Sequence, residues 1–128
     1  MNDQKTAWPR EIRLNSDKNK LAVDFDDGRN FEYTAEFLRV LSPSAEVQGH
    51  TPDQRVTVPG KRDVLIKAVE PVGNYAVRIV FDDSHDTGLY SWEYLHELGE
   101  SYDNRWREYL DELEEKNLSR ASQARSAT

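Results

Sequence analysis

The sequence predicts a single α+β domain, built from a largely antiparallel sheet of about five to six strands in two hairpins, short helices and a C-terminal amphipathic helix. Three observations predict this class. Apolar and polar residues alternate in two separate regions, which is the pattern of half-buried strands. Elsewhere the apolar spacing changes to three and four residues, which is typical of helices. The 128 residues, without a cysteine, suffice for one core but not for two domains.

Three strands are expected in the first quarter of the chain. Residues 8–14 alternate apolar and polar side chains, which predicts the first strand. Residues 21–25 and 31–33 alternate in the same way on either side of Gly28. Because glycine adopts a positive φ without a steric clash, this arrangement predicts a hairpin.

A short helix and a long loop are expected next. Residues 34–41 carry apolar side chains at helical spacing, and Thr34 stands where a helix N-cap belongs. Residues 42–63 are rich in proline, glycine and polar residues and show no clear period. Loops of this length in compact domains are usually functional or mobile. An irregular edge strand over residues 55–58 is the alternative interpretation.

The second half of the chain begins with the clearest element, a second hairpin. A β-rich run at residues 64–69 is followed by a turn at 71–74 and a nearly continuous apolar run at 75–81. The last run is typical of a central strand that is covered on both faces. Ser91 is a suitable N-cap for a second helix, and Gly99 is expected to end it.

Residues 101–116 predict a third helix with a single apolar stripe. The stripe either completes the core or supports self-association through Trp106, Tyr109 and Leu113. The polar face opposite is most simply a solvated surface.

Composition and charge limit the classes of function. The domain is expected to span residues 1–118, and the small polar residues 119–128 to form a disordered tail. A formal net charge of −7 disfavours nucleic acid as a partner, because such a surface repels phosphate. No apolar run reaches the length of a signal peptide or a membrane helix, so we expect a cytoplasmic protein that does not bind a membrane.

Few residues suggest catalysis. The lack of cysteine excludes disulfides, thiolate nucleophiles and iron–sulfur ligation. Neither a G-x-S-x-G elbow nor a glycine-rich phosphate loop occurs. Ser42, Ser44, Glu46 and His50 could meet in space, but a helix exit explains these residues more simply. We therefore expect no enzyme, no catalytic residue and no cofactor.

The segment DDSHDTG places several acidic side chains beside a histidine. Asp83, His85 and Asp86, together with His50, could collect a labile cation through oxygen and nitrogen ligands. This is the alternative hypothesis for function, a small-ligand or metal-binding domain. Asp, Ser and Gly also gather in ordinary turns, which explains most of the segment without a metal.

An aromatic cluster follows this turn. Tyr90, Trp92 and Tyr94 could form a recognition surface, since aromatic residues dominate interface hot spots. Packing in the core is the alternative. We expect Trp92 in the core and Tyr90 or Tyr94 to be partly exposed.

Three fragments occur in a specific order: WPREIRL, then LAVDFDDGRNFEYTAEFLRVLSPSAEVQGH, then VGNYAVRIVFDDSHDTGLYSWEYLHELG. Together they resemble the gamma-butyrobetaine hydroxylase-like N-terminal domain family, over about residues 8–99. In eukaryotic hydroxylases this domain precedes an oxygenase domain, which is not found in this sequence. The resemblance therefore does not imply hydroxylase activity here.

The same family resembles a zinc-binding module with three cysteines and one histidine. By the spacing of the motif, the cysteine positions fall near Ser42, Ser44 and Val47, and His85 matches the histidine. One ligand of four cannot hold zinc in a tetrahedral site. The resemblance thus implies a domain that keeps the family pattern without its metal.

Bacterial members of the family stand alone, and related domains are fused to P-loop ATPases linked to iron–sulfur cluster assembly. These fusions imply an accessory or docking role, in iron–sulfur cluster assembly or with an oxygenase partner. The leading hypothesis is a non-enzymatic protein-interaction module with an unidentified protein partner. Its candidate binding residues are Arg39, Ser42, Ser44, Glu46, His50, Asp83, His85, Asp86, Tyr90 and Trp92.

Overall fold

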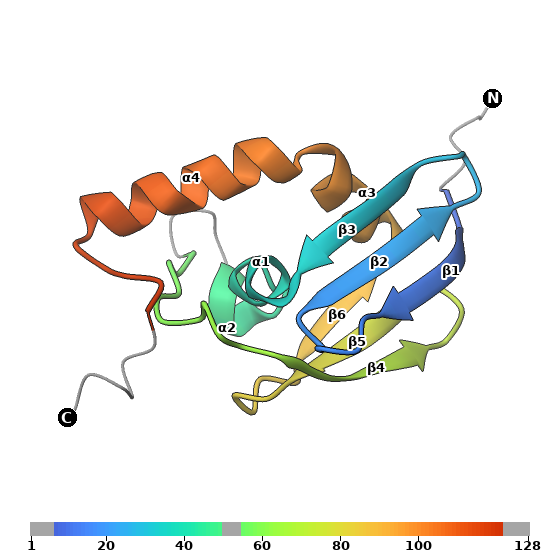
Figure 1. Cartoon of the computed structure of the whole chain (residues 1–128), viewed down its shortest axis with the longest axis horizontal. Helices are drawn as coiled ribbons and strands as arrows, with labels where there is room; N and C mark the ends of the chain where they lie inside the picture. Colours follow the sequence, from blue (N-terminus) through green and yellow to red (C-terminus); the bar gives the residue numbers. More distant parts are fainter. Residues whose placement is uncertain (1–6, 50–54, 122–128) are drawn as a thin grey trace.

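The computed structural model describes residues 7–49 and 55–121. It contains two three-stranded antiparallel sheets, in the orders β1-β2-β3 and β4-β5-β6 (Figure 1). The strands are β1 (Pro9–Leu14), β2 (Lys20–Phe25), β3 (Asn30–Thr34), β4 (Ile66–Val72), β5 (Ala76–Phe81) and β6 (Gly88–Ser91). The helices are α1 (Ala35–Val40), α2 (Ala45–Gln48), α3 (Trp92–Glu100) and α4 (Tyr102–Glu115).

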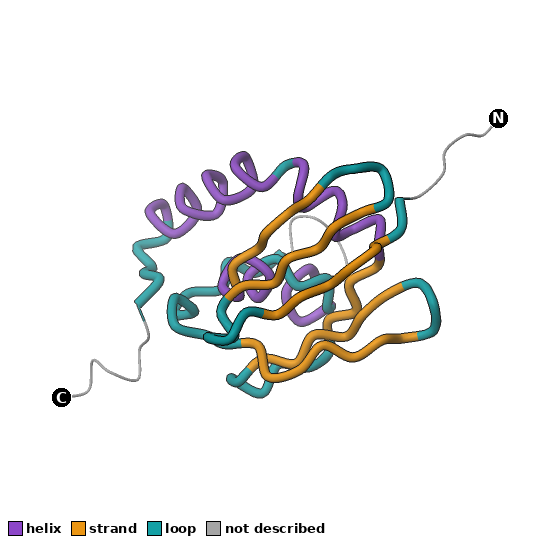
Figure 2. Tube along the Cα trace, turned by 45° about the vertical axis from the view of Figure 1, so that its right-hand side comes forward, coloured by secondary structure: helices purple, strands orange, loops and turns teal. Residues whose placement is uncertain are grey.

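The predicted α+β class and its antiparallel hairpins are confirmed, but the strands divide between two sheets instead of forming one. The inner faces of both sheets contribute to one hydrophobic core. Helix α3 packs against β3 and β6, while β1 and β4 are the opposite edges of their sheets. The strands of the two sheets lie as separate groups beside the helices in Figure 2.

The first sheet follows the alternation in the sequence. Leu21, Val23 and Phe25 of β2 are buried, whereas the residues between them are only half-buried. Gly28 has a φ of +89° in the turn that joins β2 to β3, as the hairpin requires. The first strand and the first hairpin are therefore confirmed.

The second sheet also contains an element that the sequence did not reveal. The predicted hairpin is β4 and β5, and β5 is the central strand, as its apolar run indicates. Strand β6 pairs with the other side of β5. Its four residues are too few to display a period.

Two of the predicted helices begin at the expected caps. Thr34 Oγ1 accepts the N–H of Phe37 at 3.0 Å, and Ser91 Oγ accepts that of Tyr94 at 3.1 Å. The four-residue helix α2 was not predicted, and residues 55–58 form no strand. None of the helices in the described ranges is long and apolar enough to cross a bilayer.

The expectation that Gly99 ends the second helix is wrong, because α3 continues to Glu100. A Cβ at position 99 would lie 2.3 Å from the ring of Phe31. The glycine therefore permits close packing of α3 against β3, and it does not terminate the helix.

The third predicted helix is α4, and its apolar stripe completes the core. Tyr109 and Leu113 are buried, and the ring of Tyr102 stacks on that of Phe37 with centroids 3.9 Å apart. Trp106 is half-buried beside Phe37. Tyr109 and Leu113 are thus covered by the rest of the same chain.

Ser119 and Arg120, which were expected to belong to a disordered tail, form hydrogen bonds with the rest of the domain. The carbonyls of Ser119 and Arg120 accept the backbone N–H groups of Gly60 and Arg62. The Arg120 guanidinium binds both carboxylate oxygens of Glu36, at 2.7 and 2.8 Å, and lies 5.2 Å from the ring centroid of Trp106. Residues 122–128 lie outside the described ranges.

Four buried or half-buried tyrosines donate their hydroxyl groups to main-chain carbonyls. Tyr90 and Tyr94 donate to Leu38 and Leu41, at the C-terminal end of α1. The helix leaves these carbonyls without an internal partner, so the two hydroxyls replace the missing bonds. The other two pairs are Tyr33 with Leu95, at 2.7 Å, and Tyr109 with Val58, at 2.6 Å.

Candidate functional site

Two segments about forty residues apart in the sequence meet in the structure. The segment from Ser42 through α2 packs against the loop that joins β5 to β6. Ser42 Oγ lies 2.9 Å from His85 Nε2, and Ser44 Oγ lies 2.7 Å from Thr87 Oγ1. A Cβ on Gly88 would approach Ser42 Oγ to 2.6 Å, so the glycine allows this contact.

His85 is buried and holds a defined protonation state. Burial, followed by the charge of Arg39, lowers the pKa of the imidazole below its ordinary value, which keeps the ring neutral at pH 7. The carboxylate of Glu46 lies 3.2 Å from Nδ1, so Nδ1 carries the proton. Nε2 then accepts the Ser42 hydroxyl, whose oxygen accepts the N–H of Ser44 at 3.2 Å.

Carboxylate, imidazole and hydroxyl follow one another here in the order used by acyl-transferring enzymes. Ser42, however, has 0% of its surface exposed, whereas the Glu46 side chain is 64% exposed. A nucleophile must contact its substrate, and this hydroxyl is sealed beneath the two segments. The contacts of His85 with Ser42 and Glu46 instead hold the two segments together.

Asp83, two residues before His85 in the same loop, is the centre of an ion cluster. Asp83 accepts Arg39 Nε at 2.8 Å, Lys61 Nζ at 2.6 Å and the backbone N–H of His85 at 3.1 Å. Although burial acts to raise it, the pKa of Asp83 is lowered to about 2 by the bonds from Lys61, His85 and Arg39. Arg39 Nη1 is buried without a hydrogen-bond partner in the described part of the chain.

The residues of the metal-binding alternative do not gather. Asp83 binds the side chains of Arg39 and Lys61, and the exposed Asp86 lies 3.8 Å from Arg78 on β5. His50 lies outside the described residues. Within residues 7–49 and 55–121, no three His, Cys, Asp or Glu side chains form a group that could hold a metal.

The zinc of the module that the family resembles does not fit the residues present in this chain. Ser42 and Ser44 carry neutral hydroxyls that are already hydrogen-bonded, and buried Val47 has no donor atom. Both ring nitrogens of His85 have partners of their own. This set cannot supply four tetrahedral ligands.

The expectation for the aromatic cluster is corrected at one position, Trp92. Tyr90 is fully buried, because the alternation of β6 directs it into the core. Trp92 is half-buried, and its indole N–H donates to the carbonyl of Asn74 at 2.9 Å. Tyr94 is half-buried, as expected for one of the two tyrosines.

Four exposed residues lie on α2, on the loop before β6 and on β6 itself. We call them the α2–β6 surface: Glu46, Asp86, Thr87 and Leu89. Leu89 is 43% exposed and is the apolar member of this set. Glu46 and Asp86 are the charged members of this set, and Arg78, which lies opposite Leu89 on β5, is 3.8 Å from Asp86. Leu89 and Thr87 were absent from the candidate residues, since nothing in their local sequence marks them as exposed.

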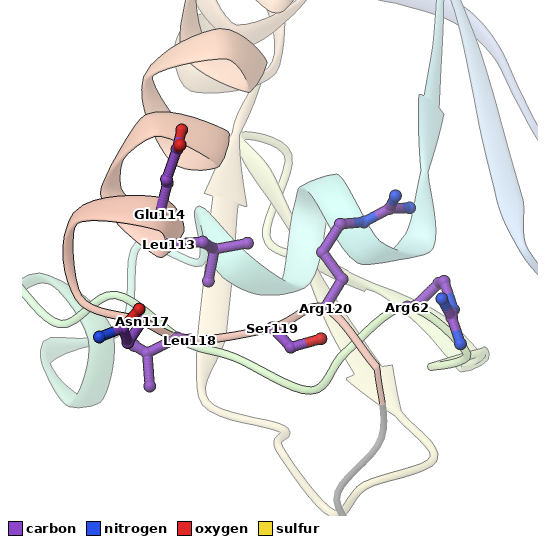
Figure 3. Close-up of a pocket in the computed structure, with 7 residues that line it drawn as sticks. All are labelled: Arg62, Leu113, Glu114, Asn117, Leu118, Ser119 and Arg120. Carbon is purple, nitrogen blue, oxygen red and sulfur yellow. The ribbon is translucent and has the colours of Figure 1, made fainter.

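Two hollows lie away from this surface. A pocket at the end of α4 is lined by Leu113, Leu118, Arg62 and Arg120, but the Arg120 guanidinium extends toward α1 to bind Glu36 (Figure 3). An apolar groove of about 410 Å³ lies between the edge strands β1 and β4; its lining residues are Ile12, Leu14, Leu21, Val69, Pro71, Val77 and Trp92.

Comparisons with known proteins agree with this fold. Residues 12–96 match the family described as gamma-butyrobetaine hydroxylase-like, N-terminal. Two solution NMR structures share 42% and 44% of residues with this chain, each with a TM-score of 0.79; they cover 91% and 95% of it, and 92% of their own chains. No curated protein matches the chain.

A crystal structure from Acidithiobacillus ferrooxidans is also similar. It shares 39% of residues with a TM-score of 0.61, covering 77% of this chain and 98% of the other. That protein is described as one of unknown function from the DUF971 family.

Proposed function

The chain belongs to the family of gamma-butyrobetaine hydroxylase-like N-terminal domains, and we propose that it is a non-enzymatic protein-interaction module that docks a partner on the α2–β6 surface. The observation that carries this proposal is the buried bond between Ser42 and His85. It fixes two polar segments beside each other although a core alone does not require them there.

Rigid placement of exposed groups favours binding, because less conformational freedom is lost when a partner arrives. On this surface Leu89 offers an apolar contact of the kind that anchors interfaces. Glu46 and Asp86 add two carboxylates to this set of residues, which favours a partner with basic side chains. Ser42, Ser44, Asp83 and His85 support the surface from beneath and do not themselves contact the partner.

The domains to which related family members are joined suggest the class of partner. We extend the proposal to a component of iron–sulfur cluster assembly or an oxygenase, for which this chain would be an accessory subunit. The resemblance alone supports this extension. The identity of the partner and the location of its docking surface are therefore tested separately.

Leu89→Arg tests the surface, with Leu110→Arg as the matched control. The two leucines are 43% and 38% exposed, but Leu110 lies on α4. Each tagged full-length variant is used to capture proteins from its own cells, and the Kd of the principal partner is then measured by calorimetry. We expect Leu89→Arg to raise that Kd by about tenfold or more and Leu110→Arg to leave it unchanged. Equal affinity for the wild type and both folded variants would refute the surface.

A further inference from the structure

The edge strand β1 has one side without a partner strand. It pairs with β2 on its inner side, and no strand of the described residues pairs with its outer side. Helix α3 packs against the edge strands β3 and β6, whereas within residues 7–49 and 55–121 no strand pairs with the outer side of β1 or of β4. Proteins usually protect such edges, because their free N–H and C=O groups invite another strand.

The hydrogen bonds identify which backbone groups of β1 face outward. The N–H of Asn15 binds the carbonyl of Lys20 on β2 at 3.1 Å. Because the bonding direction alternates along an antiparallel pair, Arg13 and Glu11 also face β2, while Ile12 and Leu14 direct their N–H and C=O groups away from the sheet. Strand β4 is the less suitable edge, because Pro71 has no N–H.

The charges of β1 complement those of a second β1. If two copies pair antiparallel about Ile12, the Ile12 residues exchange both backbone bonds, and Glu11 of each copy lies opposite Arg13 of the other. Both charged side chains are about half exposed on the solvent side of the sheet, at 57% and 50%. Glu11 can exchange its contact with Arg13, at 3.0 Å within the chain, for one across the pair, while Arg13 also binds Asp24 of β2 at 3.1 Å.

The apolar groove lies on the inner side of the same edge. A two-fold axis perpendicular to the sheet places both second sheets on one side, so the two grooves face each other. Ile12, Leu14 and Val69, which are half-buried in one copy, then lose their remaining exposure to water. The interface is isologous, as in most homodimers.

We propose that the occupant of this groove is a second copy of the chain, and that the protein forms a homodimer through antiparallel pairing of its β1 strands. This inference concerns a different surface from the one proposed for the partner, and either can fail without the other.

Charge reversal and mixing test the dimer. Sedimentation velocity of the full chain is recorded from about 10 µM to about 1 mM, a range in which weak interfaces assemble. We expect the wild type to dimerise with rising concentration. Glu11→Arg and Arg13→Glu each place like charges opposite one another twice, and each should raise the dimer Kd by about tenfold or more.

An equimolar mixture of the two variants restores opposite charges at both positions, so a mixed dimer should form again. Glu32→Lys, at an exposed position of β3, makes a charge change equal to that of Glu11→Arg, and its dimer Kd should equal that of the wild type. Thermal melts show that each variant is folded. A monomeric wild type at 1 mM, equal dimerisation of all variants, or a mixture that stays monomeric would each overturn the proposal.

Discussion

Helix α1 is held by two buried polar connections of different character. Near its start, Glu36 forms an ion pair with Arg120, 84 residues away. Just beyond its end, Ser42 forms a neutral hydrogen bond with His85. Removing a partner from the first leaves a buried charge, whereas removing a partner from the second leaves a buried dipole. The comparison teaches that two contacts of similar length can differ greatly in what their loss costs.

The ion pair should show the largest effect. Arg120→Ala leaves the Glu36 carboxylate, which is only 6% exposed, without its partner and removes the contact with Trp106. We expect the free energy of unfolding to fall by about 3 kcal/mol in urea titrations. Arg29→Ala, which breaks an exposed pair with Glu100, should cost less than about 1 kcal/mol. Similar losses in both variants would remove the distinction.

Asp83 lies between the two extremes, because it is a partly exposed carboxylate beside the neutral bond. Its pKa of about 2 in the folded state is below its ordinary value, so the unfolded chain binds more protons between about pH 4 and pH 2. Stability should therefore fall as the pH drops through this window. Asp83→Asn should cost about 2 kcal/mol at pH 7 and abolish that acid-dependent loss. An unaltered pH profile in this variant would contradict the assignment.

The neutral bond should show a smaller effect. Ser42→Ala removes the donor to His85 and the acceptor of the Ser44 N–H. Since both remaining groups are buried, we expect a loss of about 1–2 kcal/mol in urea titrations. Ser119→Ala serves as the control, because its hydroxyl accepts the N–H of Ala121 in an exposed position. Its cost should stay within about 0.5 kcal/mol.

The histidine adds a pH dependence just below neutral pH. The pKa of His85 is lower in the folded state, so the unfolded chain binds the extra proton first as the pH falls below about 6.5. Stability should thus decrease from pH 7 downward and level off below the folded-state pKa. His85→Gln should flatten this part of the profile, measured by thermal melts at constant ionic strength. An identical slope in Arg120→Ala and the wild type would show that this pH dependence belongs to His85, whereas an unchanged slope in His85→Gln would contradict it.

Local patterns in the sequence predict much of this fold. Alternation indicates β1 to β3, and the β-rich and nearly continuous apolar runs indicate β4 and β5. Thr34 and Ser91 mark helix starts because capping depends on a single side chain and the next three residues. Strand β6 and helix α2 have four residues each, which is too short for any period. Gly99 misleads, since a glycine needed for close packing looks the same in sequence as one that ends a helix.

The candidate site was less accessible to sequence reasoning. Grouping by proximity placed Ser42, Ser44 and Glu46 with His50, whereas the structure joins Ser42 and Glu46 to His85 and Ser44 to Thr87. Only the ligand positions of the family resemblance implied that Ser42 and Ser44 lie near His85. The pairing depends on how two distant loops pack, which no local spacing encodes. The anchoring role of Arg120 was missed for the same reason, because it lies within a segment whose composition resembles a disordered tail.

The hydroxyl groups that bind main-chain carbonyls give the molecule an intrinsic optical reporter. Burial raises the pKa of Tyr33, Tyr90 and Tyr109 far above the range of free phenols. In an alkaline spectrophotometric titration, the tyrosinate absorbance of these rings will develop only as the chain opens. Phenolate formation can therefore follow global unfolding without a dye or a label.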